Sequence, residues 1–423
     1  MSKMKKIISR NILSPYLLLL LNSVFGTLFP AISLWGFEFK EYDSAQFVSL
    51  LVVMLIGIFS VFFFSRMLRY PGAKPLVYIL PSIAFSYMIG IAVLFLARLP
   101  YSRAYLILSF LSFMLLGWFW YFTTRRRFLP YYAIIPNDKY KQIHELGDVP
   151  LHIIWSTDVS QLNKIQRLDG VIIDMSDEPH FRKWEQFITA CALQNIPVYN
   201  LEQVKESLTG RVKVGHVFDE QLLRLLPSPL YYGVKRVIDV LFCLLSSPLV
   251  VPVALITAIA IKIDSAGPIL FKQNRVGLGG KDFVIYKFRS MCVESEYSGA
   301  RFAETNDARV TRVGRFIRRC RIDELPQLIN VLRGNMSLIG PRPEQRSFVE
   351  NFSENIYSYP LRHVVKPGIT GWAQVMQGYA ASENDTKIKL EYDLYYIKNV
   401  SLWLDVLIAF KTIKIILTGF GAR

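Results

Sequence analysis

The chain has 423 residues, of which 52% are hydrophobic, and its mean hydropathy is +0.29. This composition is too apolar for an ordinary soluble enzyme and indicates membrane segments. The formal net charge of +16 indicates anionic partners, such as acidic lipid headgroups or phosphorylated substrates. We expect no nucleic acid partner, because no zinc-finger, homeodomain or aromatic-basic signature is present. The cysteines lack CxxC spacing, which predicts reduced thiols and no zinc site. They are Cys191, Cys243, Cys292 and Cys320.

Four apolar stretches occupy the first 125 residues, at about 12–35, 47–64, 76–96 and 105–122. Each is about long enough to cross a hydrocarbon core of roughly 30 Å as a helix, so residues 1–127 predict a four-helix transmembrane bundle. We expect no cleavable signal peptide, since further spans follow the first. The positive-inside rule places both ends of the bundle in the cytoplasm, because basic residues gather in the corresponding loops. Those residues are Lys3, Lys5, Lys6, Arg10, Arg66, Arg69, Lys74, Arg125, Arg126 and Arg127.

Residues 128–228 show a different rhythm, in which short apolar runs alternate with polar, helix-like segments such as 181–193. This rhythm predicts a small, Rossmann-like α/β domain with a parallel sheet. Nucleotide binding is an open alternative, although the turn at Pro136 holds no glycine-rich phosphate loop. The expected strands are 131–135, 151–155, 171–174 and 196–199.

A fifth apolar stretch, 237–261, is also long enough to span a membrane. Basic residues flank it on both sides, so both flanks favour the cytoplasmic face. Ser247 and Pro248 interrupt its middle, and Pro252 follows closely; proline removes an amide donor and disturbs a helix. We therefore expect a re-entrant helix at about 235–262, which breaks at Ser247 and Pro248 and returns, with serine hydroxyls satisfying the freed backbone groups. A full crossing is the alternative.

Residues 269–291 predict a β-hairpin with a glycine-rich turn at 277–280. Lys287 and Arg289 lie two apart on its second strand and would share one face. Near the C-terminus, 403–417 has the pattern of an amphipathic helix. It either lies at the membrane interface or packs against its own domain.

The densest charge pattern lies around Asp323 and Glu324, between a cluster of arginines and an amphipathic run that starts at Leu325. Pro326 is typical of a helix's first turn, so we expect the two carboxylates near a helix N-terminus, which favours negative charge. Neighbouring arginines should lower the carboxylate pKa values. An ionised carboxylate there can act as a nucleophile or hold a divalent cation. An N-cap aspartate beside a solvated basic strip is the plainer alternative.

Three motifs carry a family resemblance: Asp323–Leu328, Met336–Pro343 and Lys366–Val375. Together they resemble the bacterial sugar transferase family, the monotopic phosphoglycosyl transferases that begin polysaccharide assembly on a polyprenyl phosphate. The resemblance covers about residues 230–418. It implies a mostly α, monotopic catalytic domain at 229–423 with a re-entrant membrane helix.

The resemblance also implies a reaction. Asp323 would attack the β-phosphate of a UDP-sugar, release UMP and form a phosphosugar-aspartyl intermediate, which undecaprenyl phosphate then takes up. Glu324 would help to hold Mg²⁺, and which of the two carboxylates contacts the metal stays open. Guanidinium groups match phosphate oxygens, so Arg318 and Arg342 are the first candidates for diphosphate contacts. Further candidates are Lys287, Arg289 and Arg362.

The architecture resembles the larger members of this family. These use UDP-glucose or UDP-galactose, form homodimers, and act at the cytoplasmic face of the bacterial inner membrane in exopolysaccharide, capsule or O-antigen synthesis. We therefore expect a UDP-hexose, undecaprenyl phosphate and inner-membrane lipids as partners. An N-acetylated or amino-modified hexose is the alternative within this class. A catalytically silent scaffold of polysaccharide assembly is the alternative from another class, and a transporter is disfavoured because no intramembrane charge pair is evident.

Overall fold

The computed structural model describes residues 15–38, 42–67, 70, 76–124, 132–136, 151–154, 170–175, 178–214, 228–291, 309–377 and 383–418. The chain divides into two compact units, Met1–Gly210 and Arg211–Arg423, each of which is taken by itself. The division into three domains at 127 and 228 stays a prediction. The basic residues before the first helix, Arg125 to Arg127 and Cys292 lie outside the described residues.

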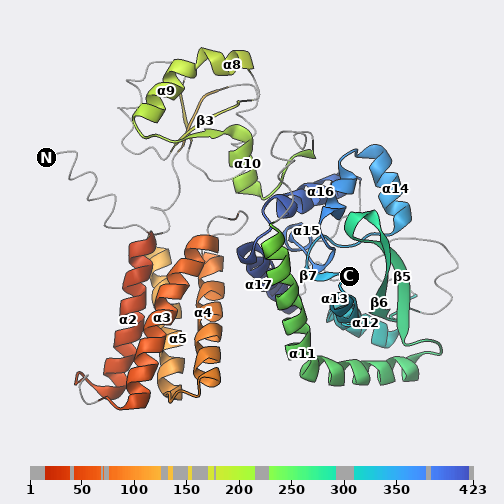
Figure 1. Cartoon of the computed structure of the whole chain (residues 1–423), viewed down its shortest axis with the longest axis horizontal. Helices are drawn as coiled ribbons and strands as arrows, with labels where there is room; N and C mark the ends of the chain where they lie inside the picture. Colours follow the sequence, from red (N-terminus) through yellow and green to blue (C-terminus); the bar gives the residue numbers. More distant parts are fainter. Residues whose placement is uncertain are drawn as a thin grey trace. The chain divides into compact units, whose positions relative to one another are not determined.

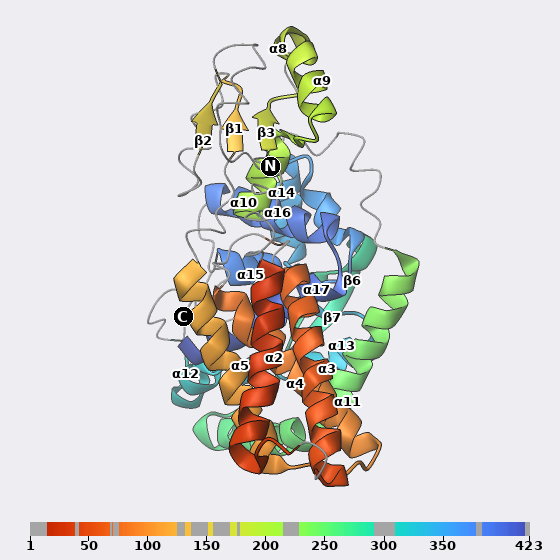
Figure 2. The ribbon, with the colours of Figure 1, turned by 90° about the vertical axis from the view of Figure 1, so that its left-hand side faces the viewer.

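Four apolar helices open the first unit: α2 (Pro15–Trp35), α3 (Ser44–Met67), α4 (Leu76–Leu96) and α5 (Arg103–Thr124). Figures 1 and 2 both show them running alongside one another. Some of their buried polar groups bond between helices, as where the Tyr105 hydroxyl donates to the Thr27 carbonyl at 3.0 Å, whereas several serine hydroxyls donate to the preceding turn of their own helix. By length and composition, Ser44–Met67, Tyr78–Leu96 and, in the second unit, Pro229–Asp264 can cross a membrane, whereas Leu20–Trp35 and Arg103–Phe119 are shorter apolar helices. The protein is a membrane protein, and four complete crossings stay a prediction.

The next described strands of the first unit form a small parallel sheet. They are β1 (Tyr132–Ile134), β2 (Leu151–Ile153), β3 (Gly170–Ile173) and β4 (Val198–Asn200), in the order β2-β1-β3-β4. All four strands fall within or next to the expected runs, and the parallel pairing is confirmed. The described helices of this part are α8 (Glu178–Lys183), α9 (Glu185–Leu193) and α10 (Leu201–Thr209). Strand β3 is buried on both faces, because α9 packs on one and α10 on the other. The Rossmann-like relationship stays a prediction.

The second unit begins with α11 (Pro229–Asp264), a helix of 36 residues. It continues through Pro248 and Pro252, and Figure 1 shows it bending sharply midway, so the expected break is a bend. The Ser247 hydroxyl donates to the Leu244 carbonyl at 2.7 Å, the acceptor that the missing amide of Pro248 cannot serve. Most of the apolar side chains of α11 are exposed within the unit, as expected of a surface that meets lipid. Entry into and return from the membrane stay a prediction.

An antiparallel hairpin follows, β5 (Leu270–Val276) and β6 (Asp282–Phe288), joined by the 3₁₀ turn η5 (Leu278–Gly280). Gly279 and Gly280 both have positive φ, which explains the glycine-rich turn. The predicted hairpin is therefore confirmed. The remaining elements are α12 (Arg312–Arg319), η7 (Ile322–Glu324), α13 (Gln327–Arg333), β7 (Ser337–Ile339), α14 (Arg346–Asn355), η8 (Tyr359–Val364), β8 (Gly368–Thr370), α15 (Trp372–Met376), α16 (Glu383–Lys398) and α17 (Leu402–Thr418).

Strands β7 and β8 pair in parallel and bring two of the sequence motifs side by side. Their backbones approach so closely that a Cβ at Gly368 would lie 2.1 Å from the Gly340 nitrogen. A Cβ at Gly340 would lie 2.4 Å from the Lys366 carbonyl oxygen. Glycine is required at both positions, since real Cβ atoms do not come this near to backbone atoms.

Helix α17 packs against its own unit, because Leu404, Leu407 and Ile408 are almost fully buried. Asp405 on this helix accepts hydrogen bonds from Lys235, from the Tyr231 hydroxyl at 2.7 Å and from the Tyr396 hydroxyl at 2.8 Å. Of the two expectations for this segment, the structure shows the packed amphipathic helix.

Candidate active site

The adjacent carboxylates Asp323 and Glu324 lie in η7, a single 3₁₀ turn between α12 and α13. Helix α13 begins only at Gln327. The two carboxylates therefore lie in the turn before this helix, and Pro326 directly precedes the helix instead of lying in its first turn as expected. Arg321 enters this turn in the left-handed conformation, with φ 57° and ψ 18°. A non-glycine residue there stores about 1–3 kcal/mol of strain, which the surrounding structure must overcome. The chain is thus held in a costly conformation directly beside its two carboxylates.

Glu324 is buried and surrounded by three cations. Its Oε1 lies 2.8 Å from Arg342 Nη2, 3.6 Å from Lys287 Nζ and 3.7 Å from Arg321 Nη1. Burial by itself would raise the pKa of Glu324, but Arg342, Lys287 and Arg321 outweigh it and hold that pKa well below its usual range. These cations therefore favour the ionised form of Glu324.

Asp323 lies in a different environment, although it is the next residue. Its Oδ1 is buried and has no hydrogen-bond partner among the residues that the structure describes. Burial, followed by the charge of Glu324, raises the pKa of Asp323 above its usual range, against the opposing charges of Lys287 and Arg342. The expectation that nearby arginines lower both carboxylate pKa values is right for Glu324 and wrong for Asp323, because burial dominates there.

The structure brings two of the five predicted cations to these carboxylates. Arg342 and Lys287 contact Glu324, and burial, followed by the neighbouring Arg342, lowers the pKa of Lys287 to about 8. Arg289 donates to the carbonyl and hydroxyl oxygens of Ser265, and Arg362 pairs with Asp393, so these two have other partners. Arg318 is in the last turn of α12, shortly before η7, and its contact with a diphosphate stays a prediction. Lys287 and Arg289 were expected to share one face of the strand, but they contact different partners. Strand β6 ends between them at Phe288, so the alternation of a strand does not extend to Arg289.

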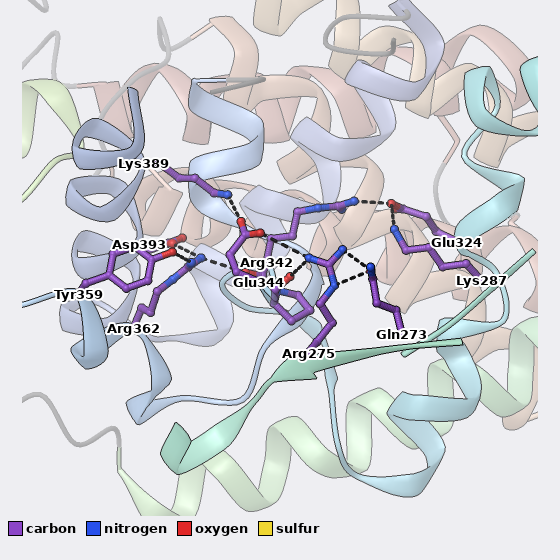
Figure 3. A network of polar contacts seen from close by, with 11 residues as sticks. Gln273, Arg275, Lys287, Glu324, Arg342, Glu344, Tyr359, Arg362, Lys389 and Asp393 are labelled. Atoms are coloured by element: carbon purple, nitrogen blue, oxygen red, sulfur yellow. Dashed lines mark hydrogen bonds and ion pairs between the residues drawn. The ribbon is translucent and has the colours of Figure 1, made fainter. Parts of the chain in front are cut away.

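Several charged residues of the site were not singled out from the sequence. Figure 3 shows a network that continues from Glu324 and Arg342 to Glu344, Arg275 and beyond. Arg321 was seen only as part of a basic cluster, and its left-handed backbone has no local sequence signal. Glu344, which directly follows the Gly340–Pro343 motif, and Arg275, on the expected hairpin, could have been found by asking which charges lie next to a predicted site element.

The residues of this site lie within a segment that matches a known protein family. The bacterial sugar transferase family matches residues 230–419, which include Asp323, Glu324, Lys287 and Arg342. A UDP-N-acetylgalactosamine-undecaprenyl-phosphate N-acetylgalactosaminephosphotransferase of Aeromonas hydrophila is 49% identical over 419 residues, 98% of this chain and 97% of that protein. The chain belongs to the bacterial sugar transferase family. The resemblance of the motifs is confirmed, and so is the prediction of a phosphoglycosyl transferase.

Other members of the bacterial sugar transferase family match about half of the chain. A UDP-glucose:undecaprenyl-phosphate glucose-1-phosphate transferase of Escherichia coli is 46% identical over 232 residues, 53% of this chain and 48% of that protein. A protein of the same name from Caulobacter vibrioides is 41% identical over 233 residues, which are 52% of this chain but 87% of that protein. About half of this chain therefore corresponds to nearly all of a shorter family member.

Magnesium was predicted from the family resemblance, and the carboxylates of this sugar transferase fit such an ion. Among the described residues no three metal-ligating side chains cluster together. Mg²⁺, however, is usually held by one or two carboxylates together with substrate phosphates. The buried Asp323 Oδ1, which no described group engages, and the ionised Glu324 supply oxygen ligands of that kind.

Proposed function

We propose that the protein transfers a hexose-1-phosphate from a UDP-sugar to undecaprenyl phosphate, giving an undecaprenyl diphosphate-sugar and UMP. The observation that carries the proposal is the pairing of a buried, unengaged carboxylate oxygen on Asp323 with a cation cluster around Glu324. Both substrates are polyanions that meet at phosphate groups, and preorganised cations stabilise the charge that develops in phosphoryl transfer. The names of the relatives support the same pair of substrates.

In the first half-reaction, Asp323 is the nucleophile. A carboxylate oxygen of Asp323 forms a bond to the β-phosphorus, the bond from that phosphorus to the bridging oxygen breaks, and the electron pair leaves with UMP. Arg342 and Lys287 hold the diphosphate oxygens in line with the attack.

In the second half-reaction, a phosphate oxygen of undecaprenyl phosphate bonds to the same phosphorus, and the Asp323 carboxylate leaves. Asp323 and Glu324 would hold Mg²⁺, which when bound neutralises diphosphate charge. The exposed apolar face of α11 gives the lipid acceptor a route to the site, since a polyprenyl chain needs an apolar surface. We place the catalytic unit at the cytoplasmic face of the inner membrane, within a homodimer.

For the sugar, the comparisons support the N-acetylated alternative over glucose or galactose. A relative that matches nearly the whole chain is named for N-acetylgalactosamine. The relatives named for glucose match about half of the chain. UDP-N-acetylgalactosamine is therefore the first donor to test, and UDP-glucose and UDP-galactose are the next.

The test is a single-turnover experiment with each UDP-sugar and Mg²⁺ but no lipid. The wild type should release about one UMP per active site and carry one phosphosugar on Asp323, detectable by intact mass. Asp323→Asn should still bind the UDP-sugar but release no UMP, because an amide cannot serve as the attacking carboxylate. If Asp323→Asn gives the same burst and adduct, the covalent role is wrong, and direct attack by the lipid phosphate with Glu324 as base replaces it. A wild type that releases no UMP from any donor, with lipid present, would support the silent-scaffold alternative.

A further inference from the structure

The position of Arg342 is set from its backbone as well as from its side chain. Its side chain reaches Glu324 at 2.8 Å, and its carbonyl oxygen accepts a hydrogen bond from Arg362 Nη2 at 2.9 Å. Arg342 lies in an irregular turn between β7 and α14. Backbone hydrogen bonds hold the turn on either side of it, from the Gly368 amide to the Pro341 carbonyl and from the Val276 amide to the Glu344 carbonyl, both at 2.9 Å. The Arg342 carbonyl between them is bonded by a side chain instead.

Arg362 is itself tightly held on the far side of this turn. It is 3% exposed, and its Nη2 lies 2.8 Å from Asp393 Oδ2, with both side chains 2% exposed. Its Nη1 donates to the Tyr359 hydroxyl at 2.6 Å, and its guanidinium lies over the Tyr359 ring at 5.0 Å from the centroid. Figure 3 shows this group at the opposite end of the network from Glu324. Arg362, which the sequence suggested as a substrate contact, is thus committed to protein partners.

A second arginine holds the next residues of the turn. Arg275 Nη1 donates to the Pro343 carbonyl at 3.2 Å, and Gln273 fixes the same guanidinium at 2.7 and 3.1 Å. Glu344, which follows, pairs with Arg275 at 3.5 Å and with Lys389. Burying so many charges is costly, and a well-packed apolar cluster would stabilise the fold as well. These charged residues surround one short turn, and we attribute this arrangement to the accuracy with which they fix the backbone of that turn.

We propose that Arg362 is a positioning residue, which Asp393 and Tyr359 hold in place so that its hydrogen bond to the Arg342 carbonyl fixes the Arg342 guanidinium beside Glu324. The inference rests on the proposed function, since it assigns Arg362 a role that acts through Arg342. It couples α16, which carries Asp393, to the cation cluster around the carboxylates.

A double-mutant cycle in the full-length protein tests this coupling. Arg362→Met with Asp393→Leu removes the pair without leaving a buried charge unpaired. It should lower kcat/KM for UMP release about 100-fold, because a displacement of about 1 Å at a catalytic group has this effect. In an Arg342→Gln background the same pair of changes should alter kcat/KM less than about twofold, since nothing remains to be positioned. A purely structural role would reduce the rate by the same factor in both backgrounds.

Tyr359→Phe is the milder version, in case the double change prevents folding. It removes one hydrogen bond to Arg362 and should lower kcat/KM about fivefold in the wild type, with no effect in the Arg342→Gln background. Asp405→Asn is the matched control, because Asp405 is similarly buried and ion-paired in the same unit, and its described polar partners are Tyr231, Lys235 and Tyr396 rather than residues 340–344. It should lower the Tm and leave kcat/KM nearly unchanged.

The outcomes distinguish a failure of the positioning role of Arg362 from a failure of the proposed function. Equal losses in both backgrounds would overturn the positioning role of Arg362 and leave the proposed function intact. An unchanged kcat/KM in Arg342→Gln alone would overturn the proposed role of Arg342, and the positioning role of Arg362 with it. Loss in the wild-type background alone would support both.

Discussion

His363 should make the stability of the catalytic unit depend on pH between about 7 and 4. This side chain is 9% exposed, and its Nε2 is buried without a hydrogen-bond partner among the described residues. Burial, then the positive charges of Arg362 and Arg346, lower the pKa of His363 to about 4, and Glu344 opposes them only in part. The ordinary pKa of histidine is about 6.5.

The sign and the magnitude follow from these two values. Above pH 7 the imidazole is neutral in both states and adds no pH dependence. As the pH falls from 7 to 4, the unfolded chain takes up a proton that the folded chain cannot, so the free energy of unfolding decreases. The loss should be about 2 kcal/mol at pH 5 and about 3 kcal/mol near pH 4.

The assay compares the wild type with His363→Gln, which keeps a polar side chain but cannot titrate. Between pH 7.5 and pH 5, the Tm of the detergent-solubilised wild type should fall by about 6 °C more than that of the variant. Carboxylates that titrate in this range are common to both proteins, so their contribution cancels in the comparison. Equal decreases in Tm would refute the reasoning, since they would mean that His363 is protonated in the folded protein or exchanges readily with water.

Gly368→Ala should lower the free energy of unfolding by about 3 kcal/mol, measured by denaturant titration, because its Cβ would lie 2.1 Å from a facing backbone nitrogen. A stable Gly368→Ala protein would mean that β7 and β8 lie farther apart. Lys287→Met should lower kcat/KM for UMP release about 100-fold, whereas Lys272→Met, an exposed lysine on the same hairpin, should leave it unchanged; equal effects would argue against a role at Glu324. A chain that begins at Pro229 should retain UMP release, because the family match covers 230–419, and a folded but inactive truncation would mean that the first unit contributes to the site.

The sequence predicted those parts of the fold that depend on local pattern. Long apolar runs located α2 to α5 and α11, and short apolar runs separated by helix-like segments located the parallel sheet. A glycine-rich turn between two alternating segments located the hairpin. The bend in α11 was anticipated from Pro248, and the hydroxyl of Ser247 satisfies a freed carbonyl as expected.

The site was predicted only where a residue type carries its own chemistry. The Asp323-Glu324 pair and Arg342 stand in recognisable motifs, and the structure places Glu324 and Arg342 in contact. Neither the opposite pKa directions of two adjacent carboxylates nor the protein-bound position of Arg362 could be foreseen. Both depend on burial and on partners distant in sequence, such as Lys287 and Asp393, which only the folded chain brings near.

The close pairing of β7 with β8 restricts how this enzyme can be recombined with its relatives. The segment that ends in Gly340 and the segment that contains Gly368 meet with no space for a side-chain atom. A chimaera joined between residues 346 and 365 would have to fit the backbone of one parent against that of another at this contact. Junctions near residues 210 or 228 leave both strands in one parent, so donor specificity should be exchanged by moving the catalytic unit whole.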